Sequence, residues 1–416
     1  LIGIEHMTER EGGEKRGLFP SLFRWPLAKP VQTGLLVMLA LTLIAVALVG
    51  RPLLMGRVYN GGDITRLYLP QRVELARALH EGRLPWWSAR LGLGYPLLAE
   101  GEVGALYPLN WLTYAWLSPE IGLTLSIVLH YIWAALGLAL FLRVAGRSWW
   151  AALLGAVAAS FGGFVGAHLT HISMLTVASW LSWMLLATRA LIMGRHPWRA
   201  GLALALCVAL QFLAGHPQIS LLGLLIVGAF ALWCALLSSA RRWRRFAAWA
   251  AALAAGTVLA LPQLVPAVEL ALQSQRAGGL DAAFFTSYSF HPLLTATLLS
   301  PFVRGTPDPE GSVELMAYIG LLPLALAVVA LRRGPGRERW FWAGLSLLGL
   351  LLAFGRWNPL YAYLQYVPVF NLFRVPARYL YWTDLGLACL AAQGADALVA
   401  GAALKPHGRA GLAWGV

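Results

Sequence analysis

The sequence predicts an all-α polytopic integral membrane protein, and three observations support this. The chain has 416 residues, of which 59% are hydrophobic and only 12% charged, and its mean hydropathy is +0.66. Apolar stretches of about 20 residues, long enough to cross a hydrocarbon core of roughly 30 Å as a helix, recur along it. These stretches lack the alternation of barrel strands, and in lipid only helices and closed barrels satisfy the backbone.

Ten apolar segments are predicted to span the membrane, and an eleventh begins near Gly411. The ten are expected at residues 31–50, 121–142, 150–167, 172–190, 199–214, 218–237, 247–270, 314–331, 340–354 and 379–401. The first run is longer than the hydrophobic part of a signal peptide, so we expect an uncleaved anchor. The chain then divides into a tail, 1–30, and a transmembrane domain, 31–416, of about eleven helices with the last one truncated.

The distribution of basic residues predicts the orientation. With a cytoplasmic N-terminus, the inner connections hold fifteen of the 32 Lys and Arg residues and a single acid, Glu338. The short outer connections hold no Lys or Arg. Inner loops of membrane proteins carry such an excess of positive charge. The long loops 51–120, 273–313 and 355–378 are therefore expected outside, and most acids fall on that face.

Composition and cysteine placement exclude other classes of protein. The net charge of +14 is dispersed between spans instead of forming one basic patch, so no nucleic-acid partner is expected. Cys207, Cys234 and Cys389 all lie in apolar segments. They predict small core residues and neither a disulfide framework nor a metal site.

The first outer loop carries an acidic turn and a short amphipathic helix. Asp63 follows Gly61-Gly62 at the mouth of the first span. A proline at the first helical position and a glycine past the end predict a helix over Pro70–Glu81, lying along the membrane surface. Its polar residues are expected to face away from the lipid, with one i,i+4 ion pair. These residues are Gln71, Glu74, Arg77 and Glu81, and the pair is Arg77 with Glu81.

Further polar residues map to the outer face. Glu100 and Glu102 are interpreted either as metal ligands or as solvent-facing acids. The histidines His168, His171, His216 and His291 also map there, without tight metal-ligand spacing beyond the first two. The short loop that holds His216 and Gln218 is expected to aim both into an outer cavity. Glu269 and Asp384 lie near outer ends of spans, where we expect them to pair with arginines because unpaired charges in membranes are costly.

The order of motifs along the chain resembles the YfhO-like bacterial membrane proteins, from about Tyr59 to Ala395. The motifs are Gly61-Gly62-Asp63, Leu84-Pro85-Trp86-Trp87, Gly94-Tyr95-Pro96, Tyr107-Pro108-Leu109-Asn110, Gly215-His216-Pro217-Gln218, Phe290-His291-Pro292 and Phe373-Arg374-Val375-Pro376-Ala377-Arg378. That family is similar to the GT-C glycosyltransferases, which carry a catalytic acid in the first outer loop and use polyprenyl-phosphate sugars. The resemblance thus implies a GT-C-like helix bundle in the bacterial plasma (inner) membrane, with Asp63 in the position of that acid.

Two features depart from the family pattern. Many members have Gln where this sequence has Glu102, which argues against a neutral sugar-binding amide at that position. Relatives continue with more spans and often an outer soluble domain, so part of acceptor recognition is expected beyond this sequence.

The chemistry implied is transfer of a sugar from a polyprenyl-phosphate donor to an envelope glycopolymer, glycolipid or protein, with inversion. Such transfer needs a base for the acceptor hydroxyl, for which Asp63 is the candidate; the other interpretation of Asp63 is a turn-forming residue. Arg374 and Arg378 are expected to contact phosphate because the guanidinium fork suits its oxygens, or to bind lipid headgroups, with Arg66 as a weaker partner. No soluble cofactor is predicted, and a divalent metal ion stays open.

Two other functions stay open at this stage. One is a transporter or flippase of a lipid-linked or amphipathic substrate, which would show paired broken helices and midplane charges. The other is a non-catalytic membrane subunit that binds membrane lipids or a partner, in which Asp63 would be dispensable. Polar residues concentrated at one face favour the enzyme.

Overall fold

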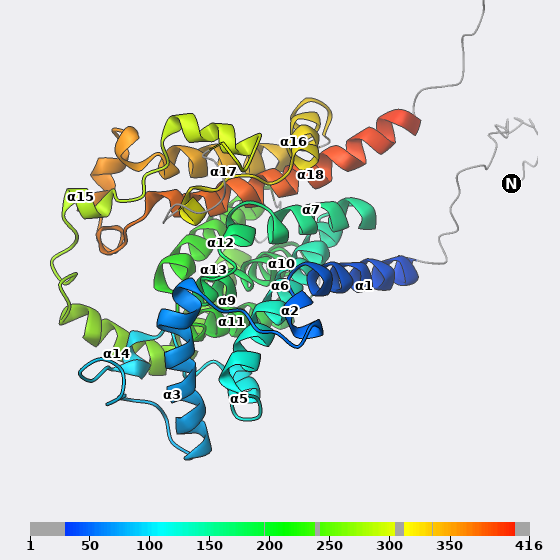
Figure 1. Ribbon diagram of the computed structural model, residues 1–416. Coiled ribbons are helices and arrows are strands. Elements are labelled where there is room, and N and C mark those ends of the chain that lie inside the picture. The colour runs from blue at the N-terminus through cyan, green and yellow to red at the C-terminus, as the bar shows by residue number, and fades with distance from the viewer. Residues whose placement is uncertain (1–29, 195, 238–241, 304–311, 335, 404–416) are drawn as a thin grey trace, which may run out of the picture.

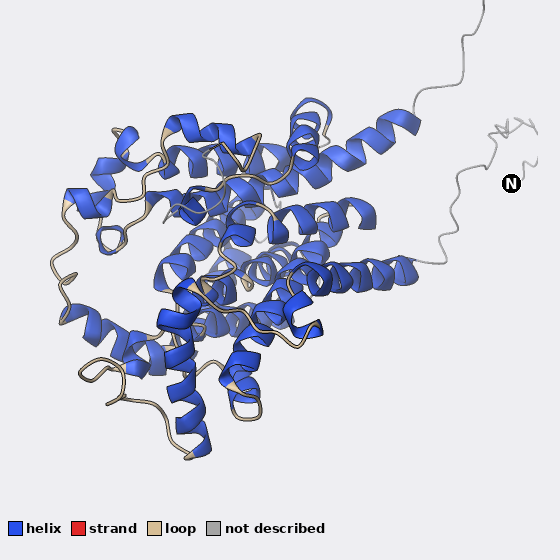
Figure 2. Ribbon diagram, in the orientation of Figure 1, coloured by secondary structure: helices blue, strands red, loops and turns tan. Residues whose placement is uncertain are grey.

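The structure is a computed structural model that describes residues 30–194, 196–237, 242–303, 312–334 and 336–403. Within these ranges every regular element is a helix, and the only β-contact is an isolated bridge between Ser88 and Tyr95 (Figure 2). The predicted all-α class is confirmed. The expected tail, apart from Pro30, and the eleventh span near Gly411 lie outside the described residues.

Several helices in the described ranges are long and apolar enough to cross a membrane. Four spans pass this test. They are α1 (Pro30–Leu48), α6 (Pro119–Val144), α9 (Ile172–Ala178) together with α10 (Leu181–Met193) as one span, and α12 (Pro217–Leu237). A fifth results if α13 (Arg242–Leu259) and α14 (Leu261–Leu272), bent by 74°, form one span. Shorter apolar helices are α7 (Trp149–Phe161) and α11 (Pro197–Leu213). This supports a polytopic membrane protein, while the total of about eleven crossings stays a prediction.

The C-terminal helices form a layer beside α7. In this layer α18 (Leu380–Ala403) packs against α16 (Leu321–Arg333), α17 (Glu338–Ala353) and α7 (Figure 1). Glu338, the acid predicted among the inner connections, accepts a hydrogen bond from Arg189 of α10 at 3.1 Å. Its charge is therefore compensated by a neighbouring helix.

Two predicted spans are interrupted at residues that break helical hydrogen bonding. The 150–167 span divides at Gly162 into α7 and α8 (Gly163–Ala167), and Gly163 takes φ +48°. Glycine adopts this region of backbone space at little cost. The 247–270 span bends before Pro262, at the first turn of α14, where a missing N–H is tolerated.

A third predicted span, 314–331, begins later than expected. Its helix α16 starts at Leu321, directly after Gly320 with φ +99°. Glu314 therefore lies in the 3-10 turn η3 (Ser312–Leu315), outside the membrane helix. The sequence expectation was wrong by about two turns because apolar residues between the two elements continued the hydrophobic pattern.

The first outer loop folds back on the bundle. Its elements are α2 (Arg51–Leu54), the π-helix η1 (Ile64–Tyr68), α3 (Leu69–His80), α4 (Leu97–Glu100) and α5 (Pro108–Tyr114). The predicted helix is confirmed as α3, but its polar side is not solvated: Gln71 and Glu74 are buried because α3 packs against α5 and α6. The expected ion pair is also wrong, since Arg77 bonds Glu74 and Glu81 bonds Arg83.

The long predicted outer loops gather at one end of the bundle. The loop helices α3, α14 and α15 lie away from the end at which α1 begins and α18 finishes (Figure 1). The elements of the later loops are α15 (Ala282–Phe285), η2 (Pro292–Leu298), η4 (Gly355–Trp357), η5 (Tyr361–Tyr366), η6 (Phe370–Leu372) and η7 (Pro376–Tyr379). This arrangement brings residues far apart in sequence to one site.

Candidate functional site

The carboxylate of Asp63 faces an imidazole. Asp63 precedes η1 and makes no capping hydrogen bond to it, so the turn-forming interpretation of its side chain is not what the structure shows. Its Oδ2 lies 3.4 Å from Nε2 of His171, and its side chain is 50% exposed. Burial, followed by the charge of His168, lowers the pKa of His171 to about 4. His171 is therefore neutral near pH 7, and its ring lies beside the Asp63 carboxylate without a well-formed hydrogen bond to it.

A second ionic group adjoins this pair. The rings of His168 and His171 are 5.1 Å apart, and Nε2 of His168 lies 3.1 Å from Glu314. Glu314 also accepts hydrogen bonds from Nη2 (2.7 Å) and Nε (3.1 and 3.2 Å) of Arg378. Burial alone would raise the pKa of Glu314, but His168 and Arg378 outweigh it and hold that pKa well below its usual range.

The guanidinium of Arg378 ties this group to α12. Its Nη1 donates to Oε1 of Gln218 at 2.6 Å, and Nε2 of Gln218 donates to the backbone oxygen of Arg374 at 2.6 Å. All three guanidinium nitrogens thus bond Glu314 or Gln218. The structure brings Arg378 and Gln218 together as predicted, but it uses the Arg378 fork inside the protein; its expected contact with phosphate stays a prediction.

Asp63, His171, His168, Glu314, Arg378 and Gln218 form one polar chain, which we call the outer chain. It joins the first loop, the α8–α9 connection, η3, η7 and the start of α12. The sequence left the two α8–α9 histidines open as metal ligands or as interfacial, hydrogen-bonded residues, and it gave no sign of Glu314, which was assigned to a membrane span. The available signal was the position of Glu314 at the first residue of the predicted span 314–331, where a charged residue indicates a loop or a functional site.

Glu102 approaches the same region from the first loop. It accepts a hydrogen bond from Ser173 at 3.5 Å, and Ser173 in turn bonds Tyr68 at 3.0 Å. Glu100 accepts from the backbone N–H of Glu102 at 3.0 Å. Burial raises the pKa of both carboxyls, and the charge of Glu102 raises that of Glu100 further. Both side chains are only partly exposed, so the interpretation as freely solvated acids fits them in part.

Arg72 was not among the predicted site residues, and it contacts this loop from the buried side of α3. It is 1% exposed, its Nη2 donates to the backbone oxygen of Glu102 at 3.4 Å, and its guanidinium lies 5.5 Å from the ring centre of Tyr114. The amphipathic pattern of this helix did not single it out. Only the packing of α3 against α5 shows it to be interior.

The remaining predicted residues lie around the outer chain. His216 is buried at the start of α12, where its Nδ1 accepts the N–H of Ile219 at 3.2 Å, and burial followed by the charge of Arg378 lowers its pKa well below the usual value. Arg374 packs over Phe284 with its guanidinium 4.8 Å from the ring centre. Arg66 is exposed on η1.

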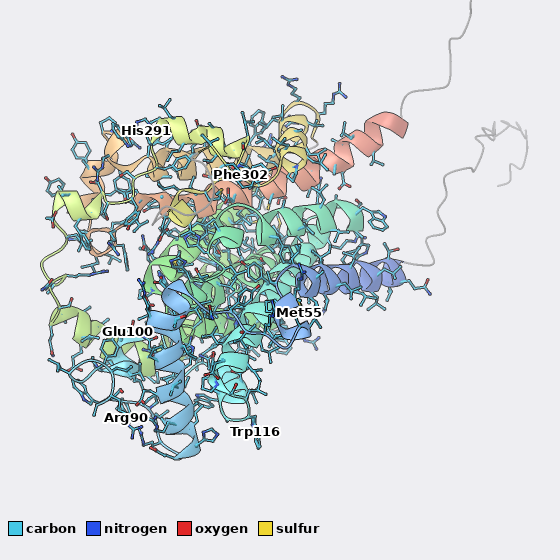
Figure 3. All side chains as sticks on the ribbon, viewed as in Figure 1. Met55, Arg90, Glu100, Trp116, His291 and Phe302 are labelled. Atoms are coloured by element: carbon cyan, nitrogen blue, oxygen red, sulfur yellow. The ribbon has the colours of Figure 1, made fainter. Side chains whose placement is uncertain are left out.

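His291 does not join the outer chain. Its Nδ1 accepts the N–H of Leu293 at 3.2 Å, and its ring meets Trp357 edge-on at 4.5 Å. Figure 3 shows it far from Glu100, on the opposite side of the loop assembly. In this structure His291 caps the start of the 3-10 helix η2.

Metal-ligating residues do not assemble in the described part of the chain. Among those residues no group of three or more His, Cys, Asp or Glu side chains is arranged to hold a metal ion. The three cysteines are free and lie inside α11, α12 and α18, as predicted. Glu269 and Asp384 form no ion pair with an arginine among the described residues, contrary to expectation.

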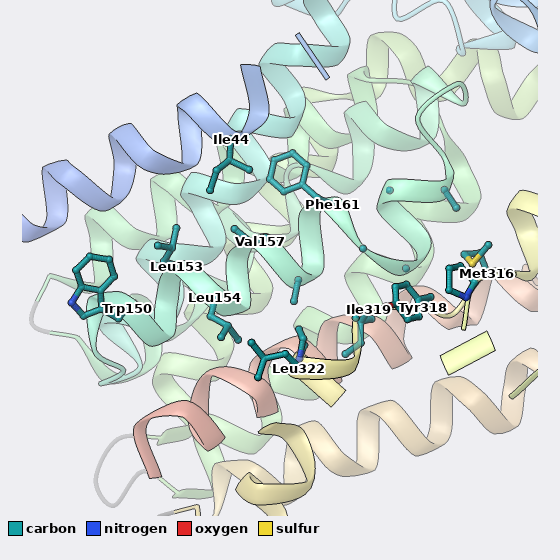
Figure 4. A pocket seen from close by; sticks show the side chains of 18 residues that line it. Ile44, Trp150, Leu153, Leu154, Val157, Phe161, Met316, Tyr318, Ile319 and Leu322 are labelled. Carbon is teal, nitrogen blue, oxygen red and sulfur yellow. The ribbon is translucent and has the colours of Figure 1, made fainter. Parts of the chain in front are cut away.

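An apolar groove runs up to the outer chain. It has a volume of about 790 Å³ and lies between α1, α7 and the segment that leads into α16, with side chains from Trp150 at one end to Met316 at the other (Figure 4). Ala167 lines the groove and directly precedes His168, and Met316 follows Glu314 by two residues. The groove therefore ends beside the ionic groups.

A second cavity lies under the first loop. Its volume is about 250 Å³, and Glu100, Gly215, Gln263 and Phe373 are among its lining residues. Gly215 has φ +97°, and a Cβ there would come within 2.0 Å of the backbone oxygen of Gly101. This close approach fixes the α11–α12 loop against the first outer loop.

The comparisons with known proteins identify one family. The family described as Bacterial membrane protein YfhO matches residues 37–404, most of the chain. No curated protein and no solved structure matches the chain.

Proposed function

We propose that this chain, which belongs to the YfhO family of bacterial membrane proteins, is a glycosyltransferase. The donor is a polyprenyl-phosphate sugar, and the acceptor is an envelope glycopolymer, glycolipid or protein. The protein lies in the plasma membrane with a cytoplasmic N-terminus, and the outer chain is on the extracytoplasmic face. The observation that carries the proposal is an exposed carboxylate, 3.4 Å from a neutral imidazole, beside ionic groups near one end of an apolar groove.

Asp63 is the general base in this proposal. The acceptor oxygen attacks C1 of the sugar, its proton passes to the Asp63 carboxylate, and the bond between C1 and the phosphate oxygen breaks. Polyprenyl phosphate leaves, and the configuration at C1 inverts. A base must reach the hydroxyl that it deprotonates, and the 50% exposure of the Asp63 side chain meets this need. His171 lies beside the carboxylate.

The groove supports a lipid donor. A volume of about 790 Å³ lies within the range of about 300–1,000 Å³ that is typical of small-molecule sites, and its labelled side chains are apolar or aromatic (Figure 4). An isoprenoid chain seated there would deliver its phosphate to the polar end of the groove. Arg374, with Arg66, is the candidate cation for that phosphate, because Arg378 already serves Glu314 and Gln218.

Transport is a second candidate function, and one observation favours it. The helix pairs α7–α8 and α13–α14 are both interrupted, and Asp384 is buried beside the first break. Paired interruptions with an intramembrane charge are typical of secondary transporters. A flippase would move the lipid-linked substrate without breaking its glycosidic bond.

The test is sugar transfer by protein-containing membranes from a panel of radiolabelled polyprenyl-phosphate sugars. Ile44 lines the groove, whereas Leu43 next to it on α1 is 58% exposed and does not. We expect transfer from at least one donor, reduced by Ile44→Trp but not by Leu43→Trp. Movement of an intact lipid-linked sugar across the bilayer, without transfer, would favour the flippase and contradict the enzyme.

A further inference from the structure

An interrupted helix and a local helical turn meet at a small cavity inside the bundle. The interruption is Gly162, between α7 and α8, and the turn is Ser179–Trp180, where α9 continues into α10 within one membrane-length helix. A cavity of about 30 Å³ is lined by residues on both sides of the interruption and of the turn, and by α6 and α18. Its polar lining includes Ser160 of α7, Ser182 of α10 and Asp384 of α18. Three separate helices thus each contribute an oxygen-bearing side chain to the cavity lining.

Asp384 has an unsatisfied oxygen at this cavity. It is only 3% exposed, and its Oδ2 accepts the backbone N–H of Phe164 at the start of α8. Its Oδ1 is buried and has no hydrogen-bond partner. No Lys, Arg or His in the described part of the chain lies within ion-pair distance of it. The nearest arginine in sequence, Arg378, is bonded to Glu314 and Gln218.

The two serines also lack a hydrogen-bond partner in the described part of the chain. Ser160 is 3% exposed and Ser182 is 7% exposed, and neither hydroxyl takes part in a hydrogen bond found among the described residues. Buried polar groups are nearly always satisfied by protein, water or an ion. A carboxylate inside a membrane protein is costly unless it is paired, because low-dielectric surroundings do not replace its hydration.

We propose that this cavity binds one Na⁺. The ligands are Oδ1 of Asp384 and the hydroxyl oxygens of Ser160 and Ser182, and the single carboxylate balances the single charge of the ion. Carboxylate and hydroxyl oxygens are hard donors, which suit a hard cation. The volume of about 30 Å³ holds one small ion or water, and interrupted helices supply the ion sites of many membrane proteins. The site is separate from the outer chain, and it does not depend on the proposed sugar transfer.

Thermal unfolding of the purified protein in nanodiscs tests the proposal. NaCl is titrated against choline chloride at constant ionic strength, and binding of ²²Na⁺ is measured in parallel. A ligand that binds only the folded state raises Tm with the logarithm of its concentration once it exceeds Kd. We expect such a rise for Na⁺, none for choline, and about one saturable ²²Na⁺ per chain.

Variants separate an ion site from a water site. Asp384→Asn keeps an oxygen for the Phe164 N–H but removes the charge, so it should abolish both the Na⁺-dependent Tm rise and ²²Na⁺ binding. Ser346→Ala is the control: it deletes a buried hydroxyl that bonds the backbone of Thr383, outside the cavity, and should leave the Na⁺ dependence unchanged.

Two results would overturn the proposal. One is an equal Tm in Na⁺ and choline, which means that a protonated Asp384 and a water fill the site. The other is ²²Na⁺ binding that survives Asp384→Asn. If that variant does not fold, Ser160→Ala and Ser182→Ala replace it, and an Na⁺ affinity unchanged in both would equally contradict the site.

Discussion

Removing the guanidinium of Arg378 should strongly destabilise the protein. Glu314 and Arg378 have only 8% and 15% of their side-chain surface exposed, and three contacts of 2.7 to 3.2 Å join them. Arg378→Met keeps the length of the side chain but leaves Glu314 buried with His168 as its remaining ionic partner among the described residues. Breaking a buried ion pair in this way costs roughly 3–5 kcal/mol, because the surviving charge is uncompensated.

A double-mutant cycle isolates the pair. Glu314→Gln removes the other charge, so the double variant should recover part of the loss, giving a coupling of about 2 kcal/mol in the free energy of unfolding. Denaturant titration in mixed micelles measures the four proteins. Losses that add to within about 0.5 kcal/mol would refute the reasoning, since independent sites behave in that way.

The pH dependence of the same pair has a defined sign. The pKa of Glu314 is lower in the folded than in the unfolded protein, so the unfolded state binds more protons in acid. The stabilisation is therefore complete above the ordinary glutamate pKa of about 4.3 and is lost as pH falls below it. Glu314→Gln should remove this acid dependence.

Three further predictions concern the loops and the groove. The raised pKa of Glu100 means that the folded state binds more protons than the unfolded state above about pH 4.3, so stability should fall as pH rises beyond that value. Glu100→Gln should reduce the fall in Tm, of which Glu102 keeps a part, and Glu81→Gln, at an exposed acid, should leave it unchanged; an unchanged fall in Glu100→Gln would contradict this origin. Gly215→Ala should lower the free energy of unfolding by more than the ~1–3 kcal/mol of backbone strain alone, because the new Cβ would meet the backbone of Gly101. Gly146→Ala is the control, because Gly146 has φ +87° with open space around it and should show only the strain. Equal losses in the two variants would contradict the close approach. Ile44→Trp should reduce crosslinking of a photoreactive polyprenyl phosphate to the protein several-fold relative to Leu43→Trp, and labelling that is equal in the two variants would show that the chain does not occupy the groove.

The fold class was predictable because the signal is long and repeated. Segments such as 121–142 and 218–237 returned as α6 and α12 with ends shifted by only a few residues. Prediction failed where the hydrophobic pattern runs on through a break. At Gly320 the apolar residues continue without a gap, so the sequence alone carried Glu314 into the membrane.

The site was predictable only in part. Loop position and residue type led to Asp63, Gln218 and Arg378, which all belong to the outer chain. The pairing of these side chains depends on tertiary contacts, since Arg378 and Glu314 lie 64 positions apart in the sequence. Likewise, the interior position of Arg72 follows from the packing of α3, which the period of a single helix does not specify.

The most direct test of the central claim is the rate of sugar transfer by Asp63→Asn relative to wild type, measured in membranes that contain equal amounts of folded protein. Asp281→Asn is the matched control, because Asp281 is an outer-loop acid that caps α15 by accepting the Phe284 N–H at 2.9 Å, and asparagine caps equally well. If Asp63 is the general base, Asp63→Asn should lose about 10²–10⁴-fold in rate and Asp281→Asn almost nothing. Equal transfer by wild type and Asp63→Asn would contradict the account.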